Sequence, residues 1–159
     1  MRRLLGTLLV LLVLVAGVGA CSDASPDAVD NPSTTAAPSD PPAEPTEVAI
    51  LSQTAAGGTV STRAVPLPDA AAVARFTRQF EKPLLGNQVA AKVRATEVPG
   101  GQVLVGAVIA IGCDVPPGVT VSDLGDGLAI VPDKVASPMQ ECFAPVTSVA
   151  LVLVDAGLV

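Results

Sequence analysis

Residues 102–113, QVLVGAVIAIGC, form a nearly continuous apolar run in which valine and isoleucine dominate. Strands buried on both faces have such runs, whereas strands with one solvated face alternate apolar and polar residues. The run therefore predicts a central strand that other elements cover on both faces, with Gly106 at a bulge or a close packing contact. Residues 146–154, VTSVALVLV, are expected to form a second buried strand.

Turn residues mark two hairpins, each flanked by segments with strand character. The paired segments are residues 47–54 with 59–65, around Gly57 and Gly58, and residues 119–124 with 128–132, around the turn GDG.

One helix is expected after the segment PLPD. Asp69 is a good N-cap, and Val73, Phe76 and Phe80 recur at three- and four-residue spacing on one helical face. Pro83 is expected to end this helix.

Residues 87–98, NQVAAKVRATEV, alternate between apolar and polar positions and predict another strand. Its apolar face would hold Val89, Ala91, Val93 and Ala95. The expected fold is therefore mostly β, a small antiparallel sandwich or half-barrel with one short helix and one disulfide.

The first twenty residues follow the pattern of a secretory signal peptide. Arg2 and Arg3 form a basic head, residues 4–20 carry no charge, and small residues close the stretch. A transmembrane helix is the alternative, because an apolar stretch of this length is near the minimum for spanning about 30 Å of hydrocarbon.

Val18, Gly19, Ala20 and Cys21 are a branched apolar residue, two small residues and a cysteine. In this pattern the chain resembles bacterial prolipoproteins, and its Ala, Val and Pro bias is similar to that of actinobacterial members of unassigned function. The resemblance implies cleavage before Cys21 and diacylation of its sulfur, which would anchor the protein to the outer face of the cell membrane. An ordinary signal peptide with a chance cysteine is the alternative.

With Cys21 assigned to lipid, Cys113 and Cys142 remain as an even pair in an exported chain, and they predict a disulfide.

Residues 22–45 hold six prolines and five acidic residues, with no Leu, Ile, Lys, Arg or aromatic residue. Such a segment buries too little apolar surface to fold, so residues 21–45 are expected to be a disordered, lipid-anchored tether. Residues 46–159 are expected to form a single globular domain.

The chain contains no His, Tyr or Trp, which excludes Ser-His-Asp and Cys-His catalysis and histidine-ligated zinc. Residues 46–159 carry seven Lys and Arg against ten Asp and Glu. This balance disfavours nucleic-acid binding and electrostatic attraction to anionic lipid. We expect no enzymatic activity, no cofactor and no metal site; the oligomeric state stays open.

The loop GCDVPPG, residues 112–118, is the main candidate for recognition. A rigid Pro-Pro turn beside a disulfide can present a fixed surface, formed here by Asp114, Pro116, Pro117 and Gly118. The alternative is a purely structural corner.

Three further sets of charged residues have a functional and a structural interpretation, and the structural one is preferred for each. Calcium ligands or turn residues are the two interpretations of Asp123, Asp126 and Asp133. An anion site or a solvated strand face are those of Lys92, Arg94 and Glu97. A site for an acidic partner or charges at a helix end are those of Arg63, Arg75 and Arg78.

The order of elements in residues 53–80 and 105–121 resembles the PrcB-type subunit of bacterial surface protease complexes, although GCDVPPG stands where that family has a TGGY-like turn.

The missing catalytic residues and the disulfide-braced scaffold favour a non-enzymatic binding or accessory domain for a protein partner at the cell envelope. A small-ligand or substrate-binding lipoprotein is the alternative, and an enzyme that uses carboxylates, Lys or Ser is the third hypothesis.

Overall fold

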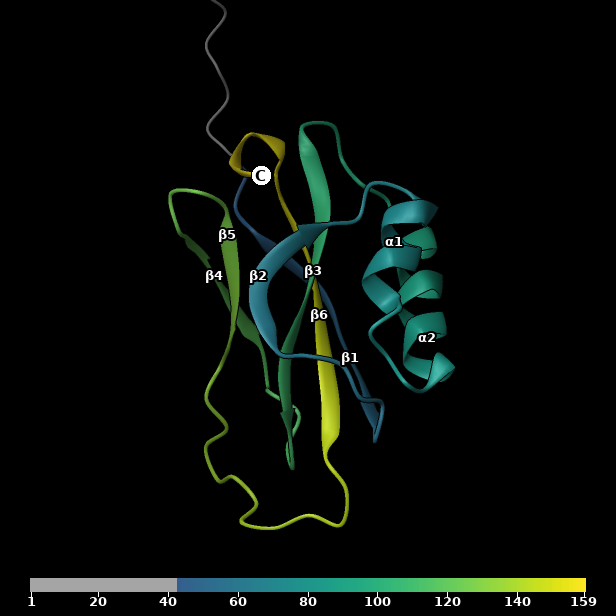
Figure 1. Ribbon diagram of the computed structural model, residues 1–159. Helices are drawn as coiled ribbons and strands as arrows, with labels where there is room; N and C mark the ends of the chain where they lie inside the picture. The colour runs from purple at the N-terminus through teal and green to yellow at the C-terminus, as the bar shows by residue number, and fades with distance from the viewer. Residues whose placement is uncertain (1–42) are drawn as a thin grey trace, which may run out of the picture. The chain divides into compact units, whose positions relative to one another are not determined.

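The computed structural model describes residues 43–159. The predicted signal peptide at 1–20, the lipidated Cys21 and nearly all of the predicted tether lie outside the described residues. The described part is mostly β, as predicted, but it has two α-helices instead of one, and a final 3-10 turn (Figure 1). Its elements are β1 (Thr46–Thr54), β2 (Ser61–Pro66), α1 (Ala70–Thr77), α2 (Pro83–Ala95), β3 (Gln102–Gly112), β4 (Val119–Asp123), β5 (Leu128–Pro132), β6 (Val146–Asp155) and η1 (Ala156–Leu158).

The six strands form one curled antiparallel sheet in the order β1-β6-β3-β2-β5-β4. β2 is strongly bent (Figure 1) and joins the two parts of the sheet. It pairs with β3 at Val65↔Gly106 and with β5 at Arg63↔Ala129. The curl makes the sheet a half-barrel, one of the two architectures that the sequence predicted.

β3 and β6 form the centre of the sheet. Their register runs from Gln102↔Asp155 to Gly112↔Val146, and both strands are buried on both faces along their middle, as predicted. One face packs under the helices and the other lies inside the curl. The helix-side cluster includes Leu104, Val108, Val149 and Leu151, and the inner cluster includes Val105, Ala107, Ile109, Ala150, Val152 and Val154.

Gly106 occupies a close packing contact in β3. A Cβ atom at this position would lie 2.9 Å from Leu67 Cδ1 and 3.2 Å from Leu151 Cδ2. Any side chain here would therefore displace the core, which confirms the close-packing interpretation of this glycine.

The first predicted hairpin is wrong, although both of its strands exist. β1 pairs with β6 from Thr46↔Leu153 to Thr54↔Val146, while β2 pairs with β3 and β5. Gly57 and Gly58 have φ of 70° and 100°, but they lie in a connection that crosses beneath the helices instead of folding back. Long pairing with the buried β6 stabilises β1 more than a local turn would, because it removes apolar surface from water.

α1 begins at the predicted cap, since the Asp69 carboxylate accepts a 2.7 Å hydrogen bond from the Ala72 N–H. Val73 and Phe76 face the core, and Phe80, beyond the end of the helix, packs edge-on against Phe76 with ring centroids 6.0 Å apart. The predicted role of Pro83 is wrong: it begins α2 instead of ending α1. The first turn of a helix needs no N–H donor, so proline fits there.

The strand predicted over 87–98 is also wrong, because these residues lie mostly in α2. Leu85, Val89 and Val93 recur every four residues toward the core, whereas Ala91 and Ala95 are exposed. Val89 and Val93 fit both the two-residue period of a strand and a four-residue helical spacing, so they do not distinguish the two. Leu85, the third residue of the helical pattern, lies outside the alternating segment. Ala, Leu, Gln, Lys and Arg are good helix formers, which decides the ambiguity. None of the helices among residues 43–159 is long and apolar enough to cross a membrane.

Two adjacent buried hydroxyls in β6 differ in their hydrogen bonding. Thr147 Oγ1 donates a 2.8 Å bond to the Gly57 carbonyl, whereas Ser148 Oγ has no partner among the described residues. We predict that Thr147→Val lowers the free energy of unfolding by about 1–2 kcal/mol, because the half-buried Gly57 carbonyl loses its donor.

Ser148→Ala is the matched control, and it should leave stability unchanged or raise it by up to about 1 kcal/mol, since it removes an unpaired polar group. Urea unfolding of both variants measures the difference. A larger loss in Ser148→Ala than in Thr147→Val would contradict this assignment.

Candidate functional site

A disulfide closes the end of the sheet where β3 stops and β6 begins. Cys113, just after β3, is bonded to Cys142, and their Cα atoms lie 5.3 Å apart. This confirms the predicted pairing. We call residues 111–118 and 133–145, which meet at this bond, the disulfide tip.

Hydrogen bonds brace the disulfide tip at three further points. The Asp114 carboxylate accepts from the Met139 N–H at 2.9 Å, and the Gly118 carbonyl accepts from the Asp133 N–H at 2.9 Å. At the β6 side, the Pro145 carbonyl accepts from the Ala55 N–H at 2.8 Å. The segment from 133 to 145 has no helix or strand, yet it is tied to its surroundings near both ends and at its middle.

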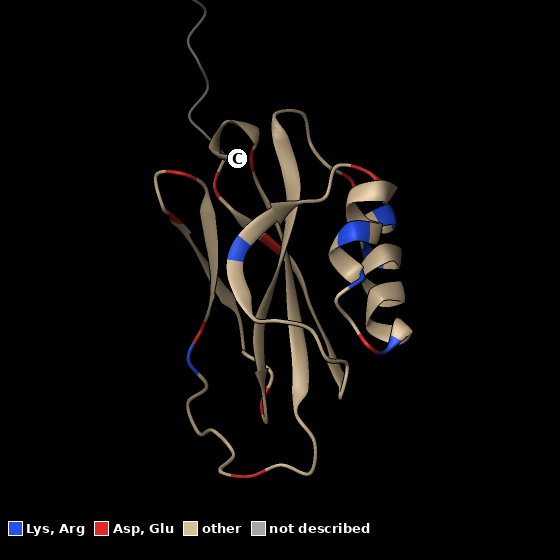
Figure 2. Ribbon diagram, in the orientation of Figure 1, with Lys and Arg blue, Asp and Glu red and all other residues tan. Residues whose placement is uncertain are grey.

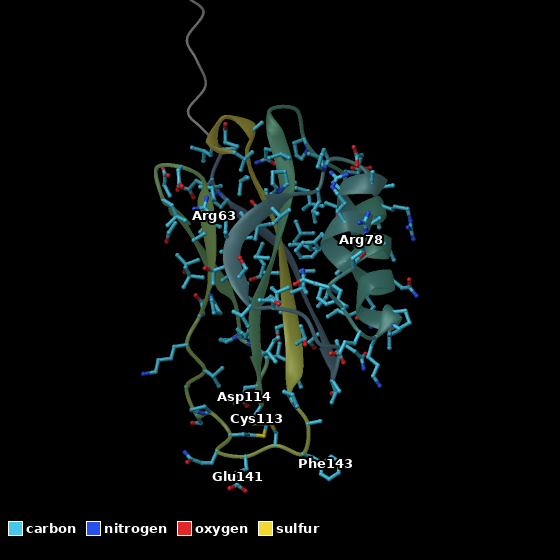
Figure 3. All side chains as sticks on the ribbon, in the orientation of Figure 1. Arg63, Arg78, Cys113, Asp114, Glu141 and Phe143 are labelled. Carbon is cyan, nitrogen blue, oxygen red and sulfur yellow. A yellow bond between two sulfur atoms is a disulfide. The ribbon has the colours of Figure 1, made fainter. Side chains whose placement is uncertain are left out.

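Phe143 stands fully in solvent at this tip. It exposes 109% of its reference surface, whereas Phe76 and Phe80 expose 8% and 9%. Figure 3 shows its ring directed away from the sheet, and the residue directly follows the disulfide-bonded Cys142 in the chain. Met139 and Val115 are also exposed there, at 55% and 44%. Exposed aromatic residues in a rigid frame are typical anchors of protein interfaces.

The four residues predicted for recognition have different environments within the tip. Pro117 is exposed, but Pro116 is buried, and Asp114 and Gly118 are half-buried and engaged in the bracing hydrogen bonds. A Cβ atom on Gly118 would lie 2.6 Å from Asp133 Oδ2. Three of the four residues thus support the loop from within.

Phe143 was not among the residues predicted from the sequence. Its signal was a lone phenylalanine next to a cysteine in the otherwise polar, proline-containing segment SPMQECFAP. Because this segment has no apolar periodicity that would bury an aromatic side chain, the sequence could have indicated that Phe143 is exposed.

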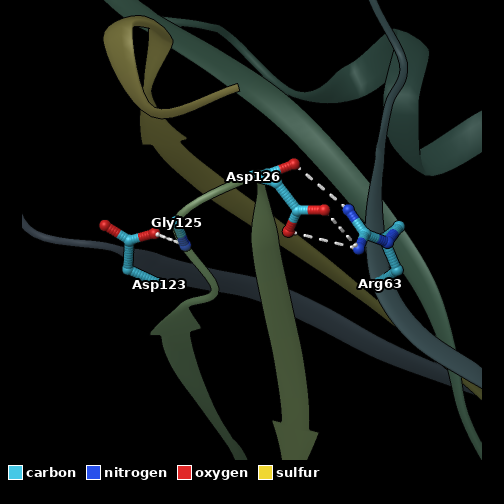
Figure 4. A network of polar contacts seen from close by, with 4 residues as sticks. All are labelled: Arg63, Asp123, Gly125 and Asp126. Carbon is cyan, nitrogen blue, oxygen red and sulfur yellow. Dashed lines mark hydrogen bonds and ion pairs between the residues drawn. The ribbon is translucent and has the colours of Figure 1, made fainter.

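The three acidic residues considered for calcium serve separate structural roles. The Asp123 carboxylate accepts from the Gly125 N–H at 2.7 Å, and Asp126 pairs with Arg63 at 3.2 Å (Figure 4). Asp133 accepts from the Thr120 hydroxyl at 3.1 Å. Within residues 43–159 no group of three or more potential ligands is placed to hold a metal ion.

The basic residues are arranged differently from the sequence-based sets. Arg63 lies on β2 and is engaged by Asp126, far from Arg78 in Figure 3. Lys92 and Arg94 lie on α2, so they share the helical layer with Arg75 and Arg78.

Comparisons with protein-family models, curated proteins and solved structures find no match to this chain.

We predict that Cys113→Ser/Cys142→Ser lowers the free energy of unfolding by about 3.5 kcal/mol, because the bond closes a loop of about 30 residues in the unfolded chain. Urea unfolding with and without reductant measures this loss. Reductant should destabilise the unsubstituted protein to the same extent and leave the double variant unchanged. Equal stability of the oxidised protein and the double variant would contradict the prediction.

Proposed function

We propose that this protein is a non-enzymatic binding domain for a protein partner at the cell envelope, held at the outer face of the membrane through lipidated Cys21. The observation that carries the proposal is Phe143, a fully exposed aromatic residue presented on a disulfide-braced tip. The absence of His, Tyr and Trp from the sequence supports a non-enzymatic role.

Burial of Phe143 in a partner's pocket supplies the driving force for binding. Transfer of a phenylalanine side chain from water to an apolar environment is worth about 1.5–3 kcal/mol. The disulfide and the Asp114–Met139 bond already order the loop. Less conformational entropy is therefore lost on association, which leaves more of the burial energy as affinity.

The charges of the disulfide tip indicate the character of the partner. Asp114, Asp133 and Glu141 lie in the disulfide tip with one basic residue, Lys134. The tip therefore carries a net charge of −2 together with its exposed apolar residues. It is complementary to an apolar pocket with basic residues at its edge, and such complementarity speeds association.

Site-specific photocrosslinking tests the proposal. A photoreactive phenylalanine analogue at position 143, in the full chain in its native envelope, should crosslink to one protein. The same analogue at Leu84, which is 51% exposed on α2, is the matched control and should not. Phe143→Ser should weaken the complex at least about 30-fold, as expected for an interface anchor worth 2 kcal/mol or more. Crosslinking of position 143 to lipid alone, or unchanged affinity in Phe143→Ser, would refute the proposal.

The anchor has an independent test. Cys21→Ser should release the chain from the membrane fraction or leave it unprocessed, because the thioether-linked lipid requires the thiol. Membrane fractionation with mass measurement of the processed chain reads this out. Normal retention of a processed Cys21→Ser chain would contradict the anchoring.

A further inference from the structure

The charges of the domain are separated between its two layers. Residues 69–95 carry five basic side chains, Arg75, Arg78, Lys82, Lys92 and Arg94, against Asp69 and Glu81, a net charge of +3. The rest of residues 46–159 carries two basic and eight acidic side chains, a net charge of −6. Figure 2 shows most of the blue positions on or beside the helices, with the others on β2 and in the loop after β5. The helical layer is therefore basic, although the net charge of residues 46–159 is −3.

The cations of this layer are free to take a ligand. In the part of the chain that the structure describes, the ion pair is Arg63 with Asp126, and none of the five helical cations takes part in one. Asp69 caps α1, since its carboxylate accepts from the Ala72 N–H, and it also lines the groove between α1 and α2. Arg78 and Arg94 are both exposed.

A groove of about 590 Å³ lies between α1 and α2, with Arg78 and Arg94 among its lining residues. Small residues line it, Ala70 and Ala74 on α1 with Gly86 and Ala90 on α2. At Gly86 the two helices approach closely, since a Cβ atom there would lie 3.3 Å from Thr77 Cβ. The buried Val73 and Phe80 and the half-buried Val93 form its apolar floor. The volume falls within the range of about 300–1,000 Å³ that is usual for small-ligand sites.

We propose that this groove binds a small amphiphilic anion, a single alkyl chain that ends in a carboxylate or phosphate. The alkyl chain lies against Val73, Phe80 and Val93, and the anionic head pairs with Arg78 and Arg94. Guanidinium groups bind carboxylate and phosphate through paired hydrogen bonds, which suits them to this head group. A concave apolar floor with cations in its lining fits such a ligand better than it fits an extended acidic peptide. The inference does not depend on Phe143.

Decanoate is the probe for the first experiment. The full chain, held in phosphatidylcholine nanodiscs, is titrated with decanoate while the methyl NMR signals of Val73 and Val93 are followed, with Ile130 on the inner face as the reference. The methyl signals of the protein report decanoate bound near these side chains, so decanoate that dissolves in the lipid does not contribute to the measurement. We expect saturable shifts at Val73 and Val93, and a 10-fold or greater loss of affinity in Arg78→Gln/Arg94→Gln.

The matched control is Arg75→Gln/Lys82→Gln, which removes the same charge from the same layer at residues that do not line the groove. It should change affinity less than twofold. Ala74→Phe, at an exposed position that lines the groove, should fill it and abolish binding while the Ile130 signals stay unchanged. The uncharged methyl decanoate should bind at least 10-fold more weakly than decanoate.

Three results would overturn the proposal. Equal losses in the two double variants would mean that only the general charge of the layer matters. Equal affinity for methyl decanoate would mean that the head group is not recognised. Tighter binding of a synthetic peptide of residues 22–42 at the same methyl groups would assign the groove to an acidic segment of this chain.

Discussion

The pairing of β3 with β6 is the interaction on which the rest of the structure depends. These two strands are buried on both faces, so the chain must supply one cover made of helices and another made of the curled strands. Gly106 lets Leu67 and Leu151 approach the centre of the pair. The Cys113–Cys142 bond then closes the end of the same two strands, and this determines where Phe143 is presented. The packing of the core and the position of the candidate site thus both depend on the pairing of β3 with β6.

The crossing segment between β1 and β2 joins the helical layer to this centre. The Ala56 carbonyl accepts from the Glu81 N–H at 2.8 Å, and the Gly57 carbonyl accepts from the Thr147 hydroxyl. Ala56 is fully buried in the helix-side cluster. The layer is therefore fixed to β6 by hydrogen bonds as well as by apolar contact. The domain thus presents two surfaces of different character. One is an acidic tip with an exposed aromatic ring, and the other is a basic layer with an apolar groove.

Sequence reasoning succeeded where one residue type has one structural use. The unbroken Val and Ile runs predicted β3 and β6, Asp69 predicted a cap, and the cysteine pair predicted the bond. It failed where local signals were ambiguous: Val89 and Val93 fit both periods, Pro83 fits both ends of a helix, and Gly57 fits a turn or a crossing. The strand assigned to α2 also hid the basic layer, because it placed Arg94 on a different element from Arg78. The exposure of Phe143 is a tertiary property, and its neighbours in the sequence gave it no periodic signature.

The proposed binding role requires the disulfide tip to be a rigid frame that holds Phe143 in solvent before any partner arrives. Backbone ¹⁵N relaxation of the oxidised chain tests it most directly, through the order parameters of residues 139–143. A braced loop predicts S² close to the value of about 0.85 found in rigid backbone. Values below about 0.6, as in flexible segments, would show that the tip does not pre-organise Phe143 for binding.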